Sequence, residues 1–204
     1  METRKVSNEQ LRKCIDGVLN NEVSNTFSCM ALAGHRTNVT DILSLYTGKS
    51  AMITLEQAKL IMGIRSAFQF ICDEIDFNDC SQLIITLAKI LGTRIDGHYG
   101  DLIIGENAYK RWHSCNSRDK TPEERAIAWF SSIVYYEPFD SMNEIVALLM
   151  FNKVLVENGI GYAIMSNYDE VRLPKVIEPF RMGEFTECPE ELGSLLESFI
   201  VRVD

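Results

Sequence analysis

The sequence lacks the features that mark several large classes of protein. Its 204 residues contain no run of 18 consecutive apolar residues, so we expect no membrane span. The start, METRKVSNEQ, has no apolar core of the kind that secretory signals carry, and we expect no such signal. Lysine and arginine are scattered and the net charge is −9, which argues against a surface that tracks a nucleic-acid backbone.

Cysteine patterns that bind metal ions are missing as well. The chain has 6 cysteines, namely Cys14, Cys29, Cys72, Cys80, Cys115 and Cys188. None of them forms a Cys-x-x-Cys pair, and no histidine stands at metal-ligand spacing from them. We interpret them as buried or free thiols in a reducing cytosol and predict a cytoplasmic protein.

Helix signals dominate what is present. Apolar residues make up 46% and charged residues 24% of the chain, a balance typical of globular proteins. Capping boxes, in which a Ser or Thr and a Glu or Gln three residues later bond each other's backbone, predict three helix starts. They are Ser7 with Gln10, Thr54 with Gln57, and Thr121 with Glu124. The sequence therefore predicts a mainly α protein.

Other segments predict different structure. Glycines surround a short apolar run in HYGDLIIGEN, residues 98–107, which indicates a small β-hairpin. The proline-containing segment LPKVIEPF, residues 173–180, is predicted to be extended. The segment PEELGSLLESFIVRV, which begins at Pro189, is predicted to be a closing helix.

One segment has the pattern of a central helix. From Met142 to Val156 the chain is apolar on almost every side, which is typical of a helix inside a packed domain. Ser141 and Glu144 form a further Ser-x-x-Glu pattern, so we predict a capping box that starts this helix. Upstream, TPEERAIAWFSSIVYY predicts an amphipathic helix that leads into the loop EPFDSMNE.

This succession of helix, loop and buried helix resembles the Fic (Fido) family, whose motif is His-Pro-Phe-x-(Asp/Glu)-Gly-Asn-Gly-Arg. The resemblance implies a mainly α, Fic-like helical domain with a small β-hairpin flap over residues 1–204. It also implies an inhibitory-helix-like segment (20–35), the flap (98–107), the core helices (121–158) and a C-terminal extension (165–204). The motif residues kept are Pro138, Phe139 and Asn143.

The other motif positions carry different residues. Glu137 stands where the family has its catalytic histidine, and Ser141 stands where it has its metal-binding acid. Four more positions differ: Met142 and Glu144 replace glycines, and Ile145 and Leu148 replace arginines. The frame of the motif is therefore kept while most of its chemical groups are changed.

In the family, this loop transfers AMP from ATP to a hydroxyl group on a protein. The resemblance implies a task for each motif residue. The histidine accepts the hydroxyl proton, and the acid holds Mg²⁺ on the phosphates. The glycines let backbone N–H groups at a helix N-terminus approach the phosphates, and the arginines clamp them.

The residues present fit these tasks poorly. Glu137 could accept a proton, but an unperturbed glutamate pKa of about 4.3 makes it a weaker base than histidine. The alternative is a solvated glutamate in a turn. Ser141 cannot replace a carboxylate as a strong Mg²⁺ ligand; Asp140, one position earlier, could supply an acid in a shifted register. Apart from Asp140 we predict no metal ligand.

Glu144 is predicted to be the most consequential change. Two like charges about 4 Å apart cost on the order of 4 kcal/mol at an effective dielectric constant of 20, so Glu144 would repel a phosphate. Asn143 could hydrogen-bond a ligand or brace the loop. Phe139, Ser141, Asn143 and Glu144 are therefore cleft positions that we do not expect to bind phosphate.

Two further segments resemble parts of the family. HYGDLIIGEN resembles the flap that holds a target peptide, so we predict docking residues at Leu102, Ile103, Ile104 and Gly105. CMALAGHRTNVTDIL resembles the inhibitory helix, with Cys29, Ala33 and Gly34 at its motif positions. In the family a glutamate of that helix pairs with the second arginine. Here Ala33 and Leu148 replace both halves of the pair, which leaves neither charge buried alone.

Three functions remain open from the sequence. The first is a Fic-like protein with a degenerate site, which needs no cofactor, does not transfer AMP in the usual way and binds a protein partner. The second is a Fic-like transferase with altered catalytic residues, which uses ATP and Mg²⁺ or another donor to modify a protein hydroxyl. The third is an unrelated helical interaction domain.

Overall fold

The computed structural model describes residues 6–75, 80–92, 115, 119–165, 169–182 and 188–203. Within them the chain forms α1 (Asn8–Asn20), α2 (Glu22–Leu32), α3 (Val39–Tyr46), α4 (Leu55–Asp73), α5 (Cys80–Leu91), α7 (Pro122–Tyr136), α8 (Asn143–Glu157), β1 (Gly161–Ala163), α9 (Asp169–Arg181), α10 (Glu190–Ser198) and β2 (Ile200–Arg202). The mainly α prediction is confirmed. The predicted hairpin at 98–107 lies outside the described residues.

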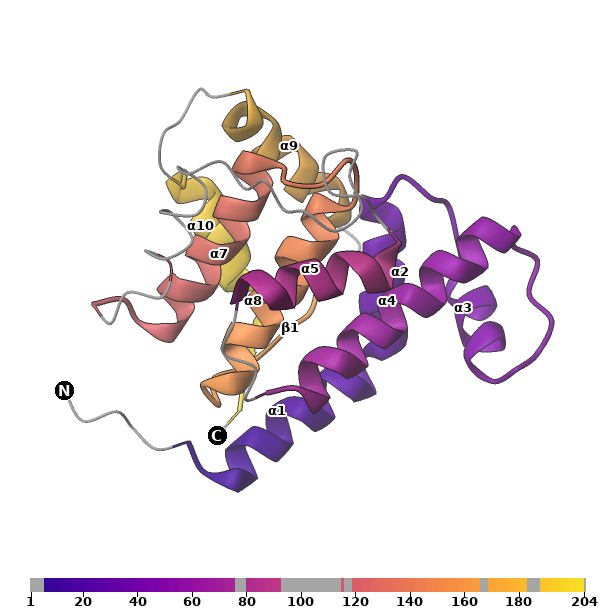
Figure 1. Ribbon diagram of the computed structural model, residues 1–204, viewed down its shortest axis with the longest axis horizontal. Coiled ribbons are helices and arrows are strands. Elements are labelled where there is room, and N and C mark those ends of the chain that lie inside the picture. The colour runs from indigo at the N-terminus through magenta and orange to yellow at the C-terminus, as the bar shows by residue number, and fades with distance from the viewer. Residues whose placement is uncertain are drawn as a thin grey trace.

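The helix α8 lies at the centre of the molecule (Figure 1). The elements α1, α2, α4, α5, α7 and β1 all pack against it. Every one of its 15 residues is buried except Glu144 and Glu157, one near each end. Burial stabilises each large apolar side chain by about 1.5–3 kcal/mol, so this helix anchors the fold. The prediction of a central helix is confirmed.

The three predicted capping boxes at the starts of α1, α4 and α7 are present. The fourth, at Ser141, is wrong. The helix α8 begins at Asn143, and its cap residue Met142 has a left-handed backbone (φ 65°) with no side-chain capping bond. A serine caps a helix from the residue directly before it, in an extended conformation. The left-handed turn at Met142 occupies that place instead.

The prediction that residues 173–180 are extended is also wrong, because they lie within α9. Both Pro174 and Pro179 are inside this helix. A proline inside a helix costs roughly 3 kcal/mol. Here Leu173, Ile177 and Phe180, at helical spacing, are at most 1% exposed, and their burial offsets the cost of the prolines. Tertiary packing therefore overrides the local proline signal.

A two-stranded antiparallel sheet follows α8 and packs against it through β1. The strand β1 pairs with β2, with Tyr162 opposite Val201, so the predicted closing helix ends early and continues as a strand. The side-chain Oδ1 of Asn152 in α8 accepts a bond of 2.8 Å from the backbone N–H of Ala163. Gly161 has no room for a side chain, because a Cβ there would lie 2.0 Å from the carbonyl oxygen of Val201.

The cysteines and the helix lengths bear on the predictions made from composition. Cys14, Cys29, Cys72 and Cys115 are buried thiols and Cys188 is a half-buried one, and none of these five forms a disulfide. Burial, together with the smaller effects of the charges of Asp73 and Glu22, raises the pKa of Cys72 to about 12. Within the described segments, none of the helices has the length and apolar character needed to cross a bilayer.

Candidate functional site

The loop between α7 and α8 contains the motif positions, and its backbone is strained at both ends. Glu137, the C-cap residue that follows α7, has φ 40°, and Met142, which precedes α8, has φ 65°. These are the positive-φ residues other than glycine in the described part of the chain. A left-handed conformation costs a non-glycine residue about 1–2 kcal/mol. Met142 stands where the resemblance implies a glycine, so the loop keeps a backbone shape that suits glycine better.

Asn143 braces this loop from inside. Its Oδ1 accepts a bond of 3.1 Å from the backbone N–H of Phe139, and its Nδ2 donates a bond of 2.9 Å to the carbonyl oxygen of the same residue. Asn143 is 5% exposed and Phe139 is 4% exposed. Both polar ends of the amide are therefore used within the protein. Of the two roles left open for Asn143, the bracing role is the one that the geometry supports.

Arg181, from the last turn of α9, joins the two glutamates at the site. Its Nη2 donates a bond of 2.5 Å to Oε1 of Glu144, in the first turn of α8. Its Nε lies 2.7 Å from Oε1 of Glu137. This second contact is an ion pair without hydrogen-bond alignment, since the buried Nε has no hydrogen-bond partner. One guanidinium thus bridges the histidine position and the second glycine position of the motif.

The position of Arg181 is fixed by its neighbour in α9. Phe180 is 1% exposed, and the centroid of its ring lies 5.1 Å from the centroid of the Tyr135 ring in α7. The side chain of Arg181 is 24% exposed, that of Glu144 19% and that of Glu137 47%. The ion network, here called the Arg181 bridge, is therefore partly shielded from water, where charge pairs are less screened than at an open surface.

The Arg181 bridge changes the electrostatic argument made from the sequence. Glu144 was treated there as an unpaired charge facing a phosphate, but it is paired with Arg181. Its place in the first turn of α8 also suits a carboxylate, because the N-terminus of a helix is its positive end. Glu137 lies at the C-terminal end of α7, where the helix dipole disfavours a negative charge, and Arg181 compensates for this.

The remaining motif positions are placed as follows. Ser141 is exposed, and its Oγ donates a bond of 3.3 Å to Oδ1 of the neighbouring Asp140. Ile145 and Leu148 are 1% and 2% exposed, inside the core. Among the described residues, no three His, Cys, Asp or Glu side chains converge in the way that a metal site requires.

The residues at the inhibitory-helix positions lie at the end of α2. Cys29 is fully buried, Ala33 is the C-cap residue of α2, and Gly34 follows in a left-handed conformation (φ 75°). The helix α2 packs against α8, which contains Leu148. The predicted flap residues Leu102, Ile103, Ile104 and Gly105 lie outside the described residues.

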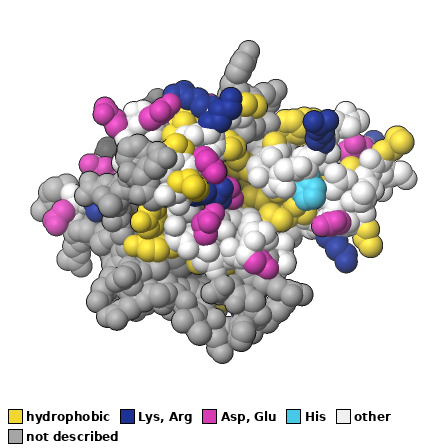
Figure 2. Space-filling view, turned by 90° about the horizontal axis from the view of Figure 1, so that it is seen from above, with side chains coloured by type: hydrophobic (Ala, Val, Ile, Leu, Met, Phe, Trp, Pro, Cys, Tyr) yellow, Lys and Arg dark blue, Asp and Glu magenta, His cyan; other side chains and the backbone are white. Residues whose placement is uncertain are grey.

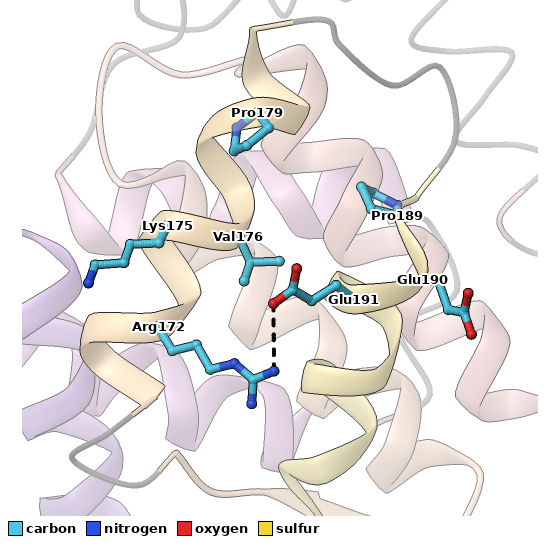
Figure 3. A pocket seen from close by; sticks show the side chains of 7 residues that line it. All are labelled: Arg172, Lys175, Val176, Pro179, Pro189, Glu190 and Glu191. Atoms are coloured by element: carbon cyan, nitrogen blue, oxygen red, sulfur yellow. Dashed lines mark ion pairs between the residues drawn. The ribbon is translucent and has the colours of Figure 1, made fainter.

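Two hollows in the described part of the structure are lined by residues outside the motif loop. One, of about 490 Å³, adjoins the end of α2 and is lined by Phe27, Ala31, Gly34, His35, Arg36 and Thr37. Another, of about 530 Å³, lies between α9 and α10 (Figure 3). Arg172 and Glu191 form an ion pair of 3.7 Å across it, with both side chains more than half exposed. Lys175 and Glu190 add one charge of each sign to its lining.

Charges of both signs also mix on the surface. On the face seen from above, Figure 2 shows acidic and basic side chains in small mixed groups. Over the described part of that face, no continuous basic patch is visible.

Known structures share this arrangement of helices. A fragment of Fic-1 from C. elegans superposes with a TM-score of 0.70 at 13% sequence identity, covering 95% of this chain and 64% of the other. A variant of the same fragment gives a TM-score of 0.69 at 13% identity, over 96% of this chain and 64% of the variant. A Fic-domain-containing signalling protein from Bacteroides thetaiotaomicron gives 0.66 at 14% identity, over 94% of this chain and 81% of that one.

The chain has the Fic fold. No protein-family model matches the sequence, and a comparison with curated proteins found no match. The chain spans 64% of the length of the C. elegans structures. The Fic fold removes the third function left open by the sequence, an unrelated helical domain.

Arg181 is the site residue that the sequence analysis missed. It follows a segment predicted to be extended, and 37 residues separate it from Glu144. The apolar spacing of Leu173, Ile177 and Phe180 was the available signal, because it places Arg181 on a helix rather than in an extended tail.

Proposed function

We propose that this protein is a Fic-fold protein that does not transfer AMP in the usual way and that acts by binding another protein. The observation that carries the proposal is the Arg181 bridge, which holds a carboxylate in the first turn of α8. In the family, that turn is where phosphates approach the backbone. Here the carboxylate of Glu144 occupies that turn. The guanidinium of Arg181, the cation that could bind a phosphate there, is already paired with Glu144.

The chemical groups for AMP transfer are also missing or engaged. Glu137, at the base position, faces Arg181. Both polar atoms of the Asn143 amide are hydrogen-bonded to the backbone of Phe139 in the loop. The two arginine positions are apolar and buried. The proposal therefore requires no nucleotide, metal ion or other cofactor.

Two observations support a protein partner. The Bacteroides structure is described as a signalling protein, and the fold is shared. Large apolar side chains are also exposed around α3, among them Val39 (49%), Leu43 (51%) and Met52 (97%). Exposed apolar groups of this kind favour contact with another protein over a small charged ligand. The predicted flap residues Leu102 to Gly105, which lie outside the described residues, remain the proposed docking segment.

One observation favours the alternative, a transferase with altered residues. The loop keeps the left-handed backbone at Met142 and the brace at Asn143, so the frame of a Fic site is intact. In that case Glu137 or Asp140 would act on a donor other than the usual one, or on ATP with Mg²⁺ in a changed pose.

Thermal melting separates the two functions. The protein is melted with ATP, GTP, CTP, and UDP- or CDP-linked donors, each with Mg²⁺. A donor at 100 times its dissociation constant stabilises a protein by about 2.7 kcal/mol. For a chain of this size that corresponds to a rise in Tm of roughly 5–10 °C. We expect no rise with any donor. A rise with ATP and Mg²⁺ contradicts the proposal, and a rise with another donor alone favours the alternative.

A further inference from the structure

Exposed apolar side chains gather at the edge of the molecule that carries α3. Val39, Leu43, Met52 and Leu55 lie between residues 36 and 59, and their exposure ranges from 49% for Val39 to 97% for Met52. This segment, here called the α3 corner, contains α3, the loops on both sides of it and the start of α4. It lies on the opposite side of the molecule from α7 and α10 (Figure 1). A group of exposed apolar residues in one place marks a contact surface.

The α3 corner is ordered without a partner. The backbone N–H of Met52 donates a bond of 3.0 Å to Oδ1 of Asp41, which joins the loop after α3 to that helix. The Nε2 of Gln57, near the start of α4, donates a bond of 3.3 Å to the carbonyl oxygen of Arg36. The apolar side chains are therefore presented on a surface that is already formed, and a partner that binds it loses less entropy in ordering the chain.

The packing of α3 determines which of its side chains are exposed. Ile42 is fully buried, and the hydroxyl groups of Tyr46 and Thr26 are hydrogen-bonded to each other at 2.5 Å, which fixes α3 against α2. Val39 and Leu43 are one turn apart and lie on the same side of the helix. Their exposure therefore results from the way α3 is anchored and not from a loose end of the chain.

The charge of the α3 corner differs from that of the whole chain. Three cations and two carboxylates give the corner one net positive charge, whereas the chain carries −9. The cations are Arg36, Lys49 and Lys59, and the carboxylates are Asp41 and Glu56. All three cations are exposed, and within the described part of the chain none of them forms an ion pair. Both carboxylate oxygens of Asp41 accept hydrogen bonds inside the corner, so they do not compete for these cations.

We propose that the α3 corner binds an acidic segment of a partner protein. Apolar side chains of that segment cover the four exposed apolar residues, and its carboxylates pair with the three cations. Protein interfaces commonly have an apolar centre and a polar rim, and charges on the rim speed association and select the partner. The inference rests on the proposed function and states the chemistry of the partner.

Charge argues against two other occupants of the α3 corner. In a symmetric dimer the same surface meets itself, so three cations would face three cations. An anionic membrane would attract the corner, but it would repel the rest of the chain, which carries all of the net negative charge. An acidic protein segment meets neither obstacle.

Selection from a library of random phage-displayed peptides tests the corner without a known partner. Wild-type protein is the bait, and peptides that also bind the variant Leu43→Ser with Met52→Ser are removed. The variant with Val171→Ser and Met182→Ser is the matched control, since it removes two exposed apolar side chains from α9. We expect the peptides that survive removal to bind this control and to carry a net negative charge beside apolar residues. If the Leu43→Ser combination does not fold, Met52→Ser alone takes its place.

The cations are tested separately, by fluorescence anisotropy with the tightest selected peptide. We expect Lys49→Gln with Lys59→Gln to raise its Kd about tenfold, because two charges of the rim are lost. Lys120→Gln with Lys175→Gln removes the same charge outside the corner and should change Kd by less than about twofold. High salt should weaken binding to the wild type and reduce the difference between the two variants.

Five outcomes overturn the proposal. Among the peptides, these are that none survives removal, that the survivors are neutral or basic, or that the two lysine pairs have equal effects. The others are binding of the wild type to vesicles of phosphatidylserine and phosphatidylcholine, and a wild-type dimer in sedimentation that Leu43→Ser with Met52→Ser abolishes. The proposed function fails on a different result, which is transfer of AMP from ATP and Mg²⁺ by the wild-type protein.

Discussion

The two ends of α8 use the same residue type in different ways. Near the C-terminal end, Asn152 is fully buried, accepts a bond from the N–H of Ala163 and donates a bond of 3.1 Å to the carbonyl oxygen of Leu148. At the N-terminal end, Asn143 makes two comparable bonds to Phe139. Its loop, however, has left-handed residues at both ends, and the glutamates beside it are partly exposed.

We propose that the C-terminal end of α8 serves the fold and that the N-terminal end is the functional one. Around Asn152 the polar groups join α8 to the sheet, and water has no access to them. Around Asn143 the loop stores backbone strain and carries an ion network that a ligand can reach. Strained residues held by their surroundings are characteristic of ligand sites. Under the proposed function, the N-terminal end has the form of a binding site that its own side chains fill.

The largest effect is expected at the structural end. Asn152→Leu leaves the N–H of Ala163 buried without an acceptor and breaks the tie between α8 and β1. We expect the free energy of unfolding to fall by about 3 kcal/mol, measured by urea denaturation. Asn20→Leu, at an exposed position, is the control and should change it by less than about 0.5 kcal/mol. A loss at Asn152 as small as at Asn20 would remove the basis of the comparison.

Asn143→Leu is the matched change at the functional end. It deprives the backbone N–H and carbonyl of Phe139 of their partners. We expect a loss of about 2 kcal/mol, because Glu137 and Asp140 on either side of Phe139 are exposed and water can replace part of the lost bonding. The same urea measurement decides the order. If Asn143→Leu costs more than Asn152→Leu, the loop is the more rigid of the two ends, and the N-terminal end of α8 is the one that holds the fold.

The two arginines of α9 allow a smaller comparison. Arg181→Met removes a cation from two partly buried carboxylates, and we expect a loss of about 1–2 kcal/mol. Arg172→Met removes an exposed pair and should cost less than about 0.5 kcal/mol. Urea denaturation of both variants at low and high salt makes the measurement. Equal losses for the two would show that the Arg181 bridge is no stronger than a surface pair.

The smallest effect concerns an ion pair near the sheet. Burial alone would raise the pKa of Glu123, but hydrogen bonds from Arg202 and from its own backbone, with the charge of Arg202, lower it below its ordinary 4.5. The resulting stabilisation is present above that ordinary value and is lost as the pH falls through the folded-state pKa. Urea midpoints of the wild type and Glu123→Gln should therefore converge at the most acidic pH values. A constant difference between them would contradict this assignment.

The parts of the fold that could be predicted from sequence were local. Caps at Ser7, Thr54 and Thr121 depend on residues three apart, and the burial of α8 follows from its composition. The helix α9 was missed because Pro174 and Pro179 indicated an extended segment. The helical spacing of Leu173, Ile177 and Phe180, which allows all three to pack in the core, was given less weight. The strand pairing of β1 with β2 was missed because it joins segments about 40 residues apart.

The candidate site divides in the same way. The kept and lost motif residues could be read from the chain, and so could the burial of Ile145 and Leu148. The pairing of Glu144 could not, because Arg181 comes from a helix that the sequence analysis did not predict. A single sequence gives the charge of a residue but not its distant partner.

A double-mutant cycle between Arg181 and Glu144 tests the central claim most directly. The free energies of unfolding are measured for the wild type, Arg181→Met, Glu144→Gln and the double variant. We expect a coupling energy of about 1–2 kcal/mol, since the two side chains share an aligned, partly buried bond. A coupling energy near zero would contradict the claim that the protein fills its own anion site with the Arg181 bridge.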